Sequence, residues 1–219
     1  MLFVPPHSGG MEIKMKILTI ADEENTYLWN NIRPDSLSDI DLILSAGDLK
    51  AEYLSFLTTI ANRPLFYVHG NHDVNYDRTP PEGCDCIDDK LITFNGLRIL
   101  GLGGSMIYNY GPYQYTERQM ERRIKRLSFK IRRAGGVDVI LTHAPVRGYG
   151  DMESLVHRGF EAFLPLLDKY KTKYLVHGHV HRNYCGPTFD RTLSYGDTTI
   201  INSCDWFIFD TEQPIFHHL

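Results

Sequence analysis

The stretch DLILSAGDLKAEYLSFLTTIANRPLFYVHGNHD, residues 41–73, alternates a strand pattern, a helix pattern and a second strand pattern. Residues 41–46 form a short apolar run that stops at Gly47-Asp48, as a buried strand does at a turn. Residues 52–61 carry apolar side chains at helical spacing, and a second apolar run follows at 65–69. The stretch therefore predicts a β-α-β unit in which polar residues follow each strand directly.

The same alternation continues on both sides of this unit. Further strands are expected at residues 16–21, 137–142, 174–177, 198–202 and 206–210, and helices at 26–31, 116–133 and 159–170. The dipeptide Asn95-Gly96 lies between two apolar runs, 91–94 and 97–101, which is the pattern of a two-residue hairpin. Parallel crossovers mixed with hairpins predict an α/β sandwich.

Composition is that of one globular domain. The chain has 219 residues, of which 42% are hydrophobic and 23% charged, so we expect a single domain over residues 15–219 after a flexible extension at 1–14. A net charge of −4 disfavours nucleic-acid binding through bulk charge. The sequence contains no apolar run long enough to cross a bilayer, so no membrane association is expected.

The cysteines are few and scattered, at positions 84, 86, 185 and 204. Four cysteines in a chain of this length do not make a disulfide framework, which favours a reduced, cytoplasmic protein. Cys84 and Cys86 form a single Cys-x-Cys pair within the acidic residues 82–89. We interpret that segment as an ordinary solvated loop rather than as a metal site.

Side chains that bind metal ions follow five of the expected strands. They are Asp22, Asp48, Asn71, His143, and the pair His179 and His181. Functional loops of open α/β sheets lie at the carboxyl ends of the strands, and one carboxylate can bridge two metals through its two oxygens. This mixture of oxygen and nitrogen donors is suited to a pair of divalent cations.

The order of these motifs resembles that of the calcineurin-like binuclear metallophosphoesterases. Gly70-Asn71-His72-Asp73 and Gly178-His179-Val180-His181 carry the resemblance most specifically, and it extends over residues 22–181. It implies an αββα sandwich of two mixed β-sheets flanked by helices. It also implies that Asp48 bridges two metals, that Asp22 and His181 hold one of them, and that Asn71, His143 and His179 hold the other.

One position departs from the family pattern. The family has a histidine two residues after the first aspartate, whereas this chain has Glu24 two residues after Asp22. We predict that Glu24 replaces the histidine as an oxygen ligand, the alternative being a carboxylate at the start of the helix from Thr26. Oxygen ligands favour harder ions, so Mn²⁺ is the expected metal, with Fe, Mg²⁺ and Zn²⁺ as alternatives.

The predicted reaction is hydrolysis of a phosphodiester or phosphomonoester by a hydroxide that bridges the two metals. By the resemblance, His72 lies near the substrate, where it protonates or orients the leaving group, and Asp73 fixes the tautomer of that imidazole. His157 and Arg158 are expected to open a helix and to contact the substrate phosphate, with a structural cap as the alternative. His69 and His177 lie inside expected strands, so we expect them to face the core or to support ligands.

Two other functions remain as alternatives. The helix at 116–133 carries many arginines and lysines after a tyrosine-rich loop, which suits either a solvated outer face or, less favoured, the nucleic-acid surface of a nuclease. Its residues Ile124, Leu127 and Ile131 form a stripe that can pack on the sheet. A non-catalytic protein that uses the same fold as an interaction scaffold is the second alternative. The residues name neither the substrate nor the oligomeric state.

Overall fold

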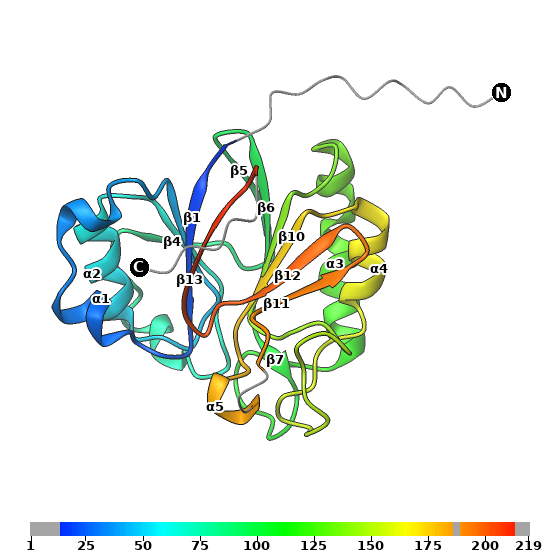
Figure 1. Ribbon diagram of the computed structural model, residues 1–219. Helices are drawn as coiled ribbons and strands as arrows, with labels where there is room; N and C mark the ends of the chain where they lie inside the picture. Colours follow the sequence, from blue (N-terminus) through cyan, green and yellow to red (C-terminus); the bar gives the residue numbers. More distant parts are fainter. Residues whose placement is uncertain (1–13, 186–188, 213–219) are drawn as a thin grey trace.

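Two β-sheets pack face to face in the centre of the molecule, and helices cover their outer faces (Figure 1). The computed structural model describes residues 14–185 and 189–212. Almost all of the expected extension at 1–14 and the terminal histidines His7, His217 and His218 lie outside these residues. The expected αββα sandwich of two mixed sheets is confirmed.

The first sheet is built around the N-terminal β-α-β repeats. Its strand order is β13-β1-β2-β3-β4, in which β1 to β4 are parallel and β13 is antiparallel to β1. The bounds are β1 Lys16–Ala21, β2 Leu42–Ser45, β3 Leu65–Tyr67, β4 Cys84–Cys86 and β13 Asp205–Asp210. The last strand thus returns beside the first, which joins the two ends of the described chain in one sheet.

The second sheet repeats this plan with the later strands. Its order is β11-β12-β10-β9-β6-β5, with a parallel centre and an antiparallel strand at each edge. The bounds are β5 Lys90–Phe94, β6 Leu97–Leu102, β9 Val139–Thr142, β10 Tyr174–His177, β11 Thr192–Tyr195 and β12 Thr198–Asn202. The expected hairpin at Asn95-Gly96 joins β5 to β6, and a small separate sheet pairs β7 Ser105–Met106 with β8 Gln114–Tyr115.

The helices lie where the parallel crossovers require them. Their bounds are α1 Thr26–Asn30, α2 Ala51–Ala61, α3 Glu117–Arg133, α4 Phe163–Tyr170 and α5 Arg182–Cys185, with 3-10 turns at Pro34–Leu37 and Val74–Asp77. In Figure 1, α1 and α2 cover the first sheet and α3 and α4 the second. The buried apolar residues accordingly form three layers, one between the sheets and one under each pair of helices. Successive strand residues therefore find an apolar surface on both faces, which explains their near-continuous apolar runs.

Helix α3 agrees with the sequence expectation except at one arginine. Thr116 caps it through a capping box with Gln119, and the expected stripe packs against the sheet, with Leu127 buried and Ile124 partly buried. Arg123 belongs to the buried side, where its guanidinium bonds Asp89 at 2.7 Å and the Gly103 carbonyl at 2.7 Å. The basic run is therefore not one uniform solvated face, because this arginine is a structural residue.

Two sequence expectations are wrong. The helix expected at 159–170 begins at Phe163, because Val146 forms a β-bridge with Phe160 and holds the preceding residues extended. Residues 82–89, expected to be a solvated loop, contain strand β4, which pairs in parallel with β3. Here Ile87 is buried and Asp88 accepts hydrogen bonds from His69 and from the backbone of Gly103, so this segment joins the two sheets.

Candidate metal centre

The polar motifs lie directly after the carboxyl ends of strands from both sheets. Asp22 follows β1 and Asp48 lies shortly after β2, while His143 follows β9 and His179 lies shortly after β10. Asp22, Asp48 and His179 have positive φ angles of 62°, 59° and 70°, a conformation that is costly for residues other than glycine. Strained backbone of this kind is typical of functional sites, where the surrounding structure holds a side chain in a required direction.

Four side chains from four loops converge on one point. The His143 Nε2 atom lies 3.1 Å from Asn71 Oδ1, 3.0 Å from His179 Nδ1 and 3.3 Å from Asp48 Oδ2. His143 is fully buried and Asn71 and His179 nearly so. One carboxylate oxygen, one amide oxygen and two imidazole nitrogens at a common point form a donor set for a divalent cation.

The outer nitrogens of the two imidazoles are held by backbone carbonyls. His143 Nδ1 donates to the Ala46 carbonyl at 2.8 Å, and His179 Nε2 donates to the Val156 carbonyl at 2.6 Å. Each bond leaves the inner nitrogen without its proton in the neutral ring, so two lone pairs face each other at 3.0 Å. This arrangement is unfavourable unless a proton or a metal ion lies between them, and metal-binding histidines are typically held through their outer nitrogens in this way.

The charges at this point indicate the same need for a cation. Burial lowers the pKa of His143, but the adjacent Asp48 carboxylate raises it more, to about 9. Burial raises the pKa of Asp48, and His143 outweighs that effect and lowers the pKa to about 2. Burial lowers the pKa of His179 to about 3, so its ring stays neutral, as a metal ligand must be. The raised pKa of His143 shows that the Asp48 carboxylate favours a positive charge at this point.

Backbone hydrogen bonds hold Asp48 in place. Its Oδ1 accepts the His72 N–H at 2.8 Å, while the Asp73 carboxylate accepts the N–H groups of Asp48 at 2.9 Å and Gly70 at 2.8 Å. The expectation that Asp73 orients the His72 imidazole stays a prediction, since no hydrogen bond between these two side chains occurs among the described residues. Asp73 Oδ2 instead joins the loops after β2 and β3. The His72 side chain itself is exposed.

Asp22 and His181 lie on the other side of the centre. Asp22 is partly buried, and both of its oxygens accept the His179 N–H at 2.9 Å. Burial raises the pKa of Asp22 to about 6, because removing its carboxylate from water disfavours the charged form. The His181 ring lies opposite Glu23, with Nδ1 3.1 Å from Glu23 Oε1. Glu24, the expected ligand, pairs instead with Lys50 at 3.3 Å.

A cavity of about 800 Å³ opens beside the centre. Asp22, Glu24, Asp48 and His72 line it on the side of the metal centre, and Lys50 and Arg78 are among the lining residues that carry positive charge. Through this opening, a small molecule can reach the candidate metal ligands Asp22 and Asp48.

The segment with His157 and Arg158 also approaches the centre. The His157 ring lies 5.5 Å from the His179 ring, and burial together with the charge of His181 lowers the pKa of His157. Arg158 is half-buried, and its Nε atom has no hydrogen-bond partner among the residues that the structure describes. Since α4 starts at Phe163, neither residue lies at a helix N-terminus, so the expectation that they open a helix is wrong. Their contact with the substrate phosphate stays a prediction.

The sequence patterns did not indicate three residues that lie at the site. Tyr108 accepts a hydrogen bond from Asn71 Nδ2 at 3.1 Å, which turns the amide oxygen of Asn71 toward His143. Glu23 and Cys204 lie within 4.8 Å of His181, ligand atom to ligand atom. The tyrosine-rich loop was a weak signal for Tyr108, whereas nothing in the local pattern around Cys204 marks it as a site residue.

The family comparison agrees with this geometry. The model of the calcineurin-like phosphoesterase family matches residues 20–183, more than half of the chain. The matched span contains Asp22, Asp48, Asn71, His143, His179 and His181. The chain therefore belongs to the calcineurin-like phosphoesterase family.

Its relatives are distant. Two UPF0046 proteins of Caenorhabditis elegans are 22% and 23% identical to it, over 91% and 93% of this chain and 72% and 80% of their own lengths. Among solved structures, GAP50, described as the anchor in the inner membrane complex of Plasmodium, superposes with a TM-score of 0.51 at 13% identity over 86% of this chain and 71% of that one. This last likeness concerns the fold alone. Of the helices in the described part of the chain, none is both long and apolar enough to cross a membrane.

Proposed function

We propose that the chain is a metal-dependent phosphoesterase that hydrolyses a phosphodiester or phosphomonoester. The observation that carries this proposal is the convergence of Asp48, Asn71, His143 and His179, with both imidazoles anchored through their outer nitrogens. Membership of the calcineurin-like phosphoesterase family supports the same reaction class.

The donor set fits two divalent ions. We assign Asn71, His143 and His179 to one ion, Asp22 and His181 to the other, and Asp48 to both. Manganese is our first expectation for the metal, with iron, magnesium and zinc as alternatives. When bound, such a pair supplies a hydroxide nucleophile near neutral pH and neutralises the charge of the phosphoryl group. We assign Glu24 to the cavity wall, because its carboxylate is paired with Lys50.

The chain itself holds the reacting groups in position. The N–H of His72 fixes Asp48 by a 2.8 Å bond, while the exposed ring of the same residue lines the cavity. The ring can therefore give a proton to the leaving oxygen without itself being needed as a ligand. Asp73 maintains this geometry by fixing the backbone of Asp48 and Gly70. We assign His157 and Arg158 to the far side of the substrate site.

Metal analysis followed by turnover of bis-p-nitrophenyl phosphate with Mn²⁺ tests the proposal. We expect about two bound ions per chain and metal-dependent release of p-nitrophenol, both abolished by a chelator and restored by Mn²⁺. Asp48→Asn, which keeps the size of the side chain but removes its charge, should lose both. Full metal occupancy without turnover of any diester or monoester would favour the scaffold function instead.

A further inference from the structure

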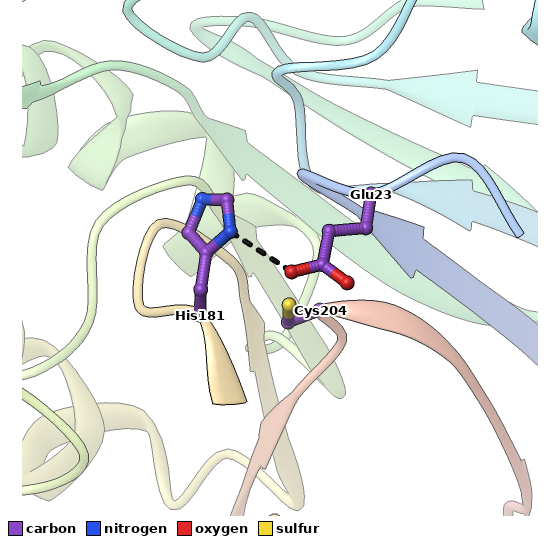
Figure 2. Close-up of side chains that lie close together, drawn as sticks. All are labelled: Glu23, His181 and Cys204. Carbon is purple, nitrogen blue, oxygen red and sulfur yellow. Dashed lines mark hydrogen bonds and ion pairs between the residues drawn. The ribbon is translucent and has the colours of Figure 1, made fainter. Parts of the chain in front are cut away.

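A second group of ligand-type side chains adjoins the centre, formed by Glu23, His181 and Cys204. The Glu23 carboxylate and the His181 ring point toward each other, and the Cys204 sulfur lies next to the carboxylate (Figure 2). The ligand atoms of the three residues all lie within 4.8 Å of one another. Cys204 is fully buried, whereas the side chains of Glu23 and His181 are 41% and 31% exposed. The group therefore has a buried wall and an open side.

The fold brings Glu23 to this point through a tight turn. Asp22 has a φ of 62°, and the Glu23 N–H bonds the Ala21 carbonyl two residues back. This turn directs Asp22 toward the backbone of His179 and Glu23 toward His181. Asp22 and Glu23, although adjacent in the chain, therefore point toward different parts of the candidate centre.

Hydrogen bonds of Asn202 and Asn25 hold the loop that carries Cys204. The Asn202 side chain accepts the Cys204 N–H at 2.9 Å and donates to the Val180 carbonyl at 2.9 Å, so it joins the loops that carry Cys204 and His181. On the other side, Asn25 donates to Asp205 at 2.7 Å, which joins the Glu23 segment to the same loop. The three donors are thus preorganised by contacts that do not need a metal ion.

From this geometry we propose that Glu23, His181 and Cys204 bind a zinc ion on the Asp22 side of the centre. One carboxylate, one imidazole and one thiolate are a usual ligand set of zinc. Burial raises the pKa of the Cys204 thiol to about 12, so zinc binding would have to replace the proton of this thiol.

The proposal also accounts for the departure at position 24. The family pattern has one imidazole there. In the proposed site, Glu23 and Cys204 take the place of that donor, whereas the Glu24 carboxylate pairs with Lys50. The inference rests on the proposed function, because His181 is a metal ligand in the proposed phosphoesterase centre and in the proposed zinc site. It makes the two metal positions chemically different, with a sulfur donor on one side only.

X-ray absorption at the zinc edge of the wild-type chain, loaded with two equivalents of Zn²⁺, tests the proposal without any substitution. We expect a sulfur scatterer at about 2.3 Å, with one sulfur for every two zinc ions. Scattering from nitrogen and oxygen alone would overturn the proposal.

Matched variants then identify the ligands. Cys204→Ala should remove the sulfur signal, whereas Cys86→Ala, in the separate His69, Cys86 and Asp88 group, should keep it. Glu23→Gln should weaken zinc binding about tenfold or more, and the same change in its neighbour, Glu24→Gln, should alter it less than about twofold. Circular dichroism of each metal-free variant checks that it folds. If Cys204→Ala does not fold, the X-ray absorption spectrum of the wild-type chain decides the question.

The outcomes separate this inference from the proposed function. A sulfur signal that disappears in Cys86→Ala instead of Cys204→Ala overturns the inference, as does an equal effect of Glu23→Gln and Glu24→Gln. Turnover of bis-p-nitrophenyl phosphate with purely nitrogen and oxygen scattering also overturns it, while the phosphoesterase function stands. A sulfur signal without turnover under any metal supports the zinc site and contradicts the phosphoesterase function.

Discussion

At the scale of single residues, Gly70 shows how closely the loops of the centre approach each other. A Cβ atom at this position would lie 2.0 Å from Asp48 Oδ1 and 2.7 Å from the Asp48 backbone nitrogen. The observed position of Asp48 therefore requires a residue without a side chain at position 70. The glycine of the Gly-Asn-His-Asp motif thus leaves room for a loop that lies more than twenty residues earlier in the chain.

Gly70→Ala is accordingly predicted to displace Asp48. We expect metal affinity to fall at least tenfold and the free energy of unfolding to fall by about 1–3 kcal/mol from overpacking. Calorimetric metal titration and chemical denaturation measure the two effects. Gly196→Ala is the control, because its Cβ would meet open space in a turn with a φ of 55°, so it should keep full metal affinity. Wild-type metal affinity in Gly70→Ala would contradict this account of the loop.

His72→Ala tests the division of work between the backbone and the side chain of one residue. The N–H that fixes Asp48 remains in the variant, and only the exposed ring is lost. We expect kcat to fall by about 10²–10⁴-fold with unchanged metal content, because a general acid is removed and no ligand is. Steady-state kinetics combined with metal analysis give the answer. A parallel loss of metal would make His72 a ligand.

At the scale of elements, the capping box of α3 fixes where the basic helix begins. Thr116 accepts the Gln119 N–H, and the Gln119 side chain accepts the Thr116 N–H at 2.7 Å. Thr116→Ala should lower the free energy of unfolding by about 1 kcal/mol, while Thr116→Ser, which keeps the acceptor oxygen, should stay near wild type. Urea denaturation of the three proteins measures the difference. Equal losses in both variants would show that the methyl group matters rather than the cap.

A second element contact joins the start of β6 to the segment before β9. The Arg98 guanidinium makes two bonds to the Asp138 carboxylate, at 2.8 and 2.6 Å, and the Arg98 N–H adds a third. Burial raises the pKa of Asp138, but these bonds lower it more, so it lies below the usual value. A pKa that folding lowers gives stability that is present above the unfolded pKa of about 3.9 and is lost as pH falls through the folded pKa.

Asp138→Asn should therefore show a pH-dependent cost. At pH 7 we expect the free energy of unfolding to fall by about 1–2 kcal/mol. This loss is smaller than that for a fully buried ion pair, because solvent screens the half-buried pair of Arg98 and Asp138. The difference between variant and wild type should shrink as the pH falls below about 4. Thermal unfolding of both proteins between pH 3 and pH 7 provides the measurement. A difference that stays constant over this range would exclude the ion pair as its source.

At the scale of the whole molecule, the candidate metal centre joins the two halves of the sandwich. Asp48 and Asn71 follow strands of the first sheet, whereas His143 and His179 follow strands of the second. Ligands that only the folded chain brings together make metal binding a source of folding stability. Saturating Mn²⁺ at about 100 times Kd should therefore stabilise the chain by about 2.7 kcal/mol and raise Tm, and a chelator should reverse this shift. A Tm that does not respond to the ion would contradict a cation site between the sheets.

The strand and helix order could be read from the sequence because its signals are local. Apolar runs ending at Gly-Asp or Gly-Asn, the Asn95-Gly96 turn and the Thr116 cap each involve residues within one turn or strand. The same logic brought Asp48, Asn71, His143 and His179 to one edge, since parallel strands present their carboxyl ends together. Strand β4 was missed because three residues in an acidic stretch carry almost no periodic signal.

By itself, then, the sequence determined the layers of the sandwich and the donors that converge at its edge. Only the tertiary structure decided that Glu23 rather than Glu24 faces His181, 158 residues further along, and that Cys204 lies beside them. The physical reason is that these contacts depend on a positive φ at Asp22 and on hydrogen bonds between distant loops. Periodicity and spacing describe neighbours in the chain and carry no information on such contacts.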